Sequence, residues 1–100
     1  MVSVIKSGIF DHWLSSLRDR VAQARIVSRL LRLEDGNFGD AKFFEGIGEL
    51  RIDTGPGYRV YFLKHGETIV VLLCGGDKAT QSRDIKAAKE LARVWKEKLN

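Results

Sequence analysis

The chain has 100 residues, of which 44% are hydrophobic and 30% charged, and a single proline, so its composition is that of a folded globular domain rather than a disordered segment. No stretch approaches the ~20 apolar residues of a membrane span, and residues 1–9 carry no secretory signal pattern. The one cysteine, Cys74, excludes an intramolecular disulfide, and we therefore expect one cytoplasmic domain over residues 1–100.

The net charge of +4 is unevenly distributed along the chain. Residues 1–32 and residues 58–100 each carry a net charge of +4, whereas residues 33–57 carry −4. Basic flanks around an acidic middle indicate either an anionic partner or helix faces solvated by Lys and Arg, and charge alone leaves both open.

The N-terminal third predicts a short edge strand and two helices. Residues 1–6 alternate weakly and end at Ser7-Gly8. Apolar residues then recur at helical spacing: Phe10, Trp13, Leu14 and Leu17. A second helical pattern covers residues 21–33 and ends at Asp35-Gly36-Asn37. The connection between the two patterns is short, so we expect antiparallel helices.

The middle of the chain predicts a loop followed by three strands. Residues 38–48 are rich in glycine and acidic, and we expect a loop pinned to the core by its phenylalanines. Alternation in residues 49–53 and 59–62 predicts half-buried strands around a turn at residues 55–57, and the apolar run in residues 68–74 predicts a central strand. The rest, after a Gly-Gly-Asp-Lys loop, predicts one closing helix.

Side chains alternate between the two faces of a strand, and this constrains the register of the first strand pair. If Leu50, Ile52, Val60 and Phe62 face the core, paired residue numbers sum to 110 or 112. The first register places Arg51 opposite Arg59, and the second places Arg51 opposite Tyr61. In both, two arginines and a tyrosine share the other face, where they form either a salt-bridge ladder with Glu49 and Asp53 or a phosphate cradle.

The following hairpin is predicted with a two-residue loop at His65-Gly66. This pairs Arg59 with Leu72 and Tyr61 with Val70, so the non-core face becomes partly apolar in the last strand. We expect the segment after Gly76 to cover it and to bring Lys78 and Gln81 toward the arginines.

Several kinds of chemistry lack their residue patterns in this sequence. Two histidines and one cysteine form no cluster at metal-ligand spacing, so we predict no metal and no cofactor. The Gly-Gly-Asp-Lys loop lacks the spacer and ending of a nucleotide-binding P-loop. What remains is a set that can bind a phosphodiester and stabilise charge developing on it: Arg51, Arg59, Tyr61, Lys64, Lys78 and Gln81.

Two segments together, ELRID-x-GPGYRVYF and GGDK-x-TQ-x-x-DI, resemble the RelE/ParE superfamily of bacterial toxins, with the closest likeness to its HigB-like "addiction module killer protein" branch. The likeness covers nearly the whole chain. It implies an α+β fold in which two N-terminal helices pack on a small antiparallel sheet and a C-terminal helix closes the molecule. It also implies a metal-independent endoribonuclease that cuts mRNA in the ribosomal A site.

Residue roles follow from the same resemblance. It implies that Arg51, Arg59 and Lys78 are catalytic. We expect the other members of the phosphodiester-binding set, Tyr61, Lys64 and Gln81, to contact RNA. Asp84 stands where RelE has a tyrosine important for the chemistry. The general base therefore stays unassigned among Lys78, Asp84 and Tyr61.

The resemblance leaves more than one activity open. The first is the toxin of a type II toxin–antitoxin system that inhibits translation, blocked by a helix-turn-helix antitoxin in a hetero-oligomeric complex, with ribosome and mRNA as targets. The alternative is a ParE-like, non-enzymatic inhibitor of DNA gyrase, since fold alone does not fix function. A nucleic-acid-binding domain without toxicity is the third.

Overall fold

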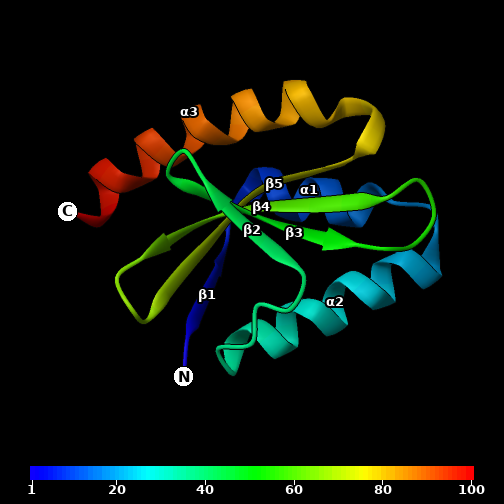
Figure 1. Cartoon of the computed structure of the whole chain (residues 1–100), viewed down its shortest axis with the longest axis horizontal. Coiled ribbons are helices and arrows are strands. Elements are labelled where there is room, and N and C mark those ends of the chain that lie inside the picture. Colours follow the sequence, from blue (N-terminus) through cyan, green and yellow to red (C-terminus); the bar gives the residue numbers. More distant parts are fainter.

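A computed structural model describes all 100 residues and shows a five-stranded sheet with helices on both faces (Figure 1). The elements in chain order are β1 (Ser3–Lys6), α1 (Gly8–Ser16), α2 (Arg20–Glu34), β2 (Ala41–Phe44), β3 (Ile47–Ile52), β4 (Tyr58–His65), β5 (Ile69–Asp77), the 3₁₀ turn η1 (Lys78–Thr80) and α3 (Gln81–Leu99). This confirms the predicted α+β class and the closing helix. None of the helices is both long and apolar enough to cross a membrane.

The sheet has the strand order β1-β5-β4-β3-β2 and is mixed rather than wholly antiparallel. β2 to β5 form an antiparallel meander, whereas β1 is the predicted edge strand and pairs in parallel with β5. The chain between these parallel strands runs through α1, α2 and the strands β2 to β4, which is more than long enough for parallel pairing. The expectation of a purely antiparallel sheet was therefore wrong at this edge.

The predicted loop over residues 38–48 contains a strand that the sequence analysis missed. β2 joins β3 through a two-residue loop, Glu45-Gly46, and both residues have positive φ, 49° and 84°. Such a loop is a type I′ hairpin turn, whose twist matches that of the flanking strands. Phe38 still packs against the core, as expected, but Phe43 lies on β2 and is half exposed.

The β3–β4 register follows the sum of 110, so Arg51 lies opposite Arg59. The predicted β4–β5 register was wrong: Arg59 pairs with Gly76 and Tyr61 with Cys74. Two features cause the shift. The loop between His65 and Ile69 has three residues, and β5 has an irregularity at Leu73, opposite the Tyr61–Phe62 step.

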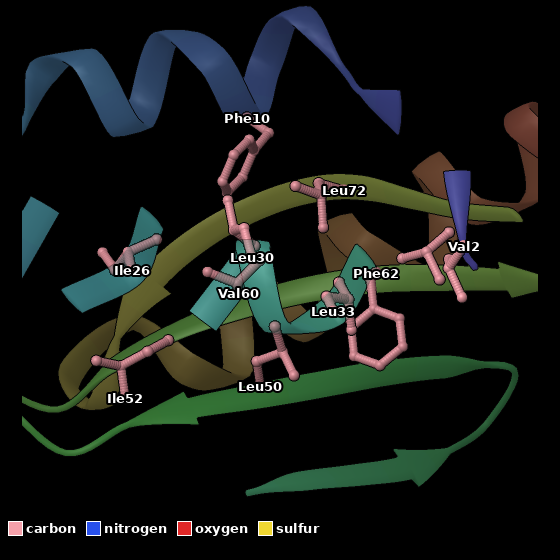
Figure 2. Close-up of a cluster of buried hydrophobic side chains, with 11 residues drawn as sticks. Val2, Phe10, Ile26, Leu30, Leu33, Leu50, Ile52, Val60, Phe62 and Leu72 are labelled. Carbon is pink, nitrogen blue, oxygen red and sulfur yellow. The ribbon is translucent and has the colours of Figure 1, made fainter. Parts of the chain in front are cut away.

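Two apolar clusters lie on opposite faces of the sheet. One joins α1 and α2 to Leu50, Ile52, Val60 and Phe62, the residues predicted to face the core; Figure 2 shows Phe10 reaching from α1 toward these strands. The other lies under α3 and contains Tyr61, Leu63, Val71 and Leu73. The segment after Gly76 thus covers the second face, as expected.

α2 is attached to the sheet edge by Arg29 as well as by its apolar face. The Arg29 guanidinium donates hydrogen bonds to the carbonyl oxygens of Arg51 (2.6 Å), Phe38 (3.0 Å) and Asp40 (3.1 Å). Burial lowers the pKa of Arg29. These bonds fix the segment before β2 next to the end of β3, where the candidate site lies.

Candidate functional site at the β3–β4 hairpin end

An open hollow of about 410 Å³ lies where the β3–β4 hairpin meets η1. We call it the basic hollow, and its lining residues are Asp40, Arg51, Ile52, Asp53, Gly57, Arg59 and Lys78. The three cations predicted to be catalytic, Arg51, Arg59 and Lys78, therefore come together around one space, although they belong to β3, β4 and η1.

Arg51 is half exposed and forms an ion pair with Asp40, at 2.9 Å between Nη2 and Oδ1. Its Nε donates to the same oxygen at 3.2 Å, and its backbone N–H donates to the Asp40 carbonyl at 2.9 Å. The acidic partner of Arg51 is thus Asp40, from the segment before β2. The predicted salt-bridge ladder would have required Glu49 or Asp53 instead. Asp40 holds Arg51 in place and offsets part of its charge.

Arg59 is largely buried, with 14% of its side chain exposed. Its Nη1 donates to the carbonyl of Gly57 at 2.8 Å, and its Nε lies 4.0 Å from the carboxylate of Glu49 but has no hydrogen-bond partner. A buried guanidinium N–H without a partner is costly unless a ligand or a shift of its neighbours satisfies it. Arg59 is thus fixed in place, and its Nε–H group is free to donate a hydrogen bond to a ligand.

Glu49 supports Arg59 from beneath. Its side chain is 3% exposed, and Gln81 donates to it at 2.9 Å. Gln81, predicted to contact RNA, therefore lies behind Arg59 and outside the lining of the hollow. Gln81 holds the Glu49 carboxylate in place through this hydrogen bond.

Glycine at position 57 makes the approach of Arg59 possible. Gly57 has a φ of +79°, which L side chains rarely adopt. A Cβ there would lie 3.1 Å from Nη1 of Arg59 and 3.6 Å from Cβ of Lys78. The Gly-Pro-Gly turn is thus both a hairpin turn and part of the wall of the basic hollow.

Lys78 is exposed and begins η1, whose geometry is fixed by a capping box. The Asp77 carboxylate accepts hydrogen bonds from the backbone N–H groups of Ala79 (2.9 Å) and Thr80 (3.2 Å), and the Thr80 hydroxyl accepts one from the Asp77 N–H. The capping box holds the Lys78 backbone in place beside the hollow and leaves its ammonium group free.

Two further predicted RNA contacts lie elsewhere. Tyr61 is completely buried under α3, its hydroxyl has no hydrogen-bond partner, and burial, with the nearby Glu49 charge, raises its pKa. Lys64 points to the opposite face of the sheet, where its ammonium lies 5.7 Å from the centre of the Phe38 ring. In this arrangement neither side chain lines the basic hollow.

Asp84, the candidate general base that stands where RelE has a tyrosine, is 8% exposed and also lies outside the basic hollow. Its carboxylate accepts a hydrogen bond from the Thr80 hydroxyl and packs against Gly76. It faces a separate groove between α1 and α3 that also contains His12 and Trp13. This position makes Asp84 a bridge between the start of α3 and β5.

Asp40 and Gly57 line the hollow but were not singled out as site residues from the sequence. The Gly-Pro-Gly turn was visible, whereas the Asp40 contact depends on the unpredicted β2 hairpin and on Arg29. No group of three or more His, Cys, Asp and Glu side chains is arranged to hold a metal ion.

Comparison with known proteins places the chain in a family. The family described as "Phage derived protein Gp49-like (DUF891)" matches residues 12–96. The chain belongs to this Gp49-like family. A Haemophilus influenzae protein described as uncharacterized is 56% identical over 85 residues, which cover 84% of this chain and 86% of the relative. The Gp49-like family is of the RelE/HigB-like toxin–antitoxin type.

Proposed function

We propose that this Gp49-like protein is the toxin of a type II toxin–antitoxin module, of the HigB-like branch, and that it is a metal-independent endoribonuclease acting on mRNA at the ribosome. The observation that carries the proposal is the convergence of Arg51, Arg59 and Lys78 on one open hollow. The toxin–antitoxin type of the family supports it.

In the proposed reaction the RNA 2′-hydroxyl attacks the adjacent phosphorus and the bond to the 5′-oxygen of the next nucleotide breaks. The products are a 2′,3′-cyclic phosphate and a 5′-hydroxyl. The 2′-hydroxyl proton goes to a base, and the leaving oxygen takes up a proton. The chain's own contribution is to hold the phosphate and to stabilise the negative charge that grows on its oxygens, which fixed cations do best in a partly dry site.

The three cations differ in their settings, and we infer different roles from this. Arg59 is the buried, preorganised donor, because Glu49 and the Gly57 carbonyl fix its guanidinium. Lys78 supplies a free, exposed charge, and Arg51 a charge shared with Asp40. Of the three general-base candidates only Lys78 lines the hollow. Its inferred role there is that of a protonated cation, which cannot accept a proton, so no side chain is assigned as the base.

The proposal includes an antitoxin partner that covers the basic hollow in a hetero-oligomeric complex, and a cytoplasmic site of action. The toxin–antitoxin type of the family supports the antitoxin partner, and the proposed target, mRNA on the ribosome, is cytoplasmic.

Induced expression followed by genome-wide mapping of RNA 5′ ends tests the activity. We expect growth arrest and new 5′-hydroxyl ends within translated mRNA for the wild type, none for Lys78→Ala, and wild-type behaviour for Lys86→Ala, an exposed α3 lysine outside the hollow. Growth arrest with intact mRNA and inhibited gyrase supercoiling would replace the endonuclease with the ParE-like alternative.

A further inference from the structure

A second hollow, of about 290 Å³, lies beside the basic hollow on the α2 side of the hairpin. We call it the arginine hollow, and it is lined by Arg25, Ser28, Arg29, Arg32, Ile52 and Asp53. Ile52 and Asp53 also line the basic hollow. The two hollows are therefore neighbours, with these two residues as their shared wall.

The arginines of this hollow follow α2 at positions i, i+4 and i+7, so they share one face of the helix. Like charges at this spacing repel one another and destabilise a helix. Arg29 is engaged with three backbone carbonyls, whereas Arg25 and Arg32 are exposed and have no carboxylate within ion-pair distance. Two guanidinium groups thus remain free beside the Ser28 hydroxyl.

Asp53 is the only acidic residue of the arginine hollow, and it forms no ion pair with any of the surrounding cations. A free carboxylate on the shared wall repels phosphate at that point. An RNA strand that crosses the wall therefore places its phosphates to either side of Asp53, in the two hollows, where the cations are.

We propose that the arginine hollow is a second phosphate subsite, in which Arg25 and Arg32 bind the backbone of the same RNA strand whose scissile phosphate lies in the basic hollow. This inference rests on the proposed endonuclease function. It names Arg25 and Arg32 as the residues that hold the flanking nucleotides, and so gives a role to two α2 arginines that have no ion-pair partner beside the basic hollow. Guanidinium groups suit this task because their planar donors match phosphate oxygens.

The test is equilibrium binding of a fluorescent, uncleavable 2′-O-methyl RNA oligonucleotide to the full chain over a series of KCl concentrations. For single strands, each phosphate contact contributes about 0.7 to the slope of log K against log salt. We expect Arg25→Ala/Arg32→Ala to reduce that slope by about 1.4 and to weaken binding about tenfold at low salt. The control is Lys6→Ala/Lys86→Ala, which removes the same charge from exposed positions outside both hollows and should leave the slope unchanged.

A slope for the arginine variant equal to that of the lysine control would overturn the inference, provided that circular dichroism shows both variants folded. So would unchanged oligonucleotide binding combined with reduced cleavage on ribosomes, because the arginines would then contact ribosomal RNA rather than the cleaved strand. Ribosome-dependent cleavage by the wild type is measured in parallel. Its absence, with the expected loss of slope still present, would remove the proposed catalysis but support the two-hollow binding surface.

Discussion

Arg59 shows how a single residue of the site depends on its neighbours. Side-chain alternation placed it on one face with Arg51 and Tyr61, and the structure agrees. Its supports, the Gly57 carbonyl and the Glu49 carboxylate, lie within the same hairpin and follow from that register. The partner of Arg51 does not, because Asp40 reaches it only through the β2 hairpin and the Arg29 hydrogen bonds. The contacts of Arg59 within the hairpin were therefore predictable, whereas the partner of Arg51, which comes from outside it, was not.

Arg59→Ala is expected to lower both stability and activity. The 3% exposed Glu49 carboxylate would lose its cation, at a cost of about 2 kcal/mol in the free energy of unfolding. Adding Glu49→Gln removes the stranded charge and should restore most of the stability but none of the cleavage. Urea unfolding and RNA cleavage of the single and double variants check this. Recovery of cleavage in the double variant would show that Arg59 acts on the fold rather than on the RNA.

Cys74 makes stability depend on pH in the alkaline range. Burial, with the charge of Asp84, raises the pKa of its thiol from the ordinary 9.0 to about 12. Between these values the unfolded chain loses the proton that the folded chain keeps, so stability falls as pH rises, by up to about 1.4 kcal/mol per pH unit. Below about pH 9 the thiol contributes no pH dependence.

The corresponding measurement is urea unfolding of the wild type and Cys74→Ala at about pH 8 and about pH 10.5. The wild type should lose about 2 kcal/mol more than the variant between the two pH values. Tyr61, whose pKa is also raised, is present in both proteins and cancels. Parallel losses in the two proteins would mean that Cys74 ionises freely in the folded state.

Among the elements, the junction of β5, η1 and α3 positions the loop that carries Lys78. The Gly-Gly-Asp-Lys pattern was visible in the sequence, but the reason for its second glycine was not. A Cβ at Gly76 would lie 1.8 Å from Oδ2 of Asp84 and 2.9 Å from the Thr80 hydroxyl. Glycine here allows α3 to begin directly against the sheet and brings Lys78 beside Arg59.

Gly76→Ala is therefore expected to destabilise the fold by about 2 kcal/mol or more, because Asp84 and Thr80 must move. Gly8→Ala is the matched control. Its Cβ meets nothing within 4 Å at the start of α1, and the change should be neutral or stabilise by up to about 1 kcal/mol. Thermal unfolding compares the two, and equal effects would show that the Gly76 contact is relieved at no cost.

At the scale of the whole molecule, periodicity predicted the helices, both sheet faces and the role of α3 as a cover. It missed the edge strand β2, the parallel pairing of the predicted edge strand β1 and the β4–β5 register. β2 is short and its Glu45-Gly46 turn looks like a loop, while the parallel pairing of β1 is a long-range contact that no local pattern encodes. The irregularity at Leu73 shifts the register in the middle of the apolar run of β5, where no change in the hydrophobic pattern marks it. Arg51, Arg59 and Lys78 therefore come together as expected, whereas Tyr61 was misplaced because α3 buries it, and Lys64 because it lies on the opposite face of the sheet.

The two neighbouring hollows gather cations around the end of the β3–β4 hairpin, from Arg25 and Arg32 of α2 to Lys78. We propose that this surface positions RNA for cleavage. The most direct test of this proposal is the cleavage rate of a defined mRNA on purified ribosomes by the wild type, Lys78→Ala and Lys86→Ala. We expect cleavage by the wild type and by Lys86→Ala, and a loss of about 10²-fold or more for Lys78→Ala with unchanged stability. Equal rates for all three proteins, or intact mRNA with the wild type, would contradict the account.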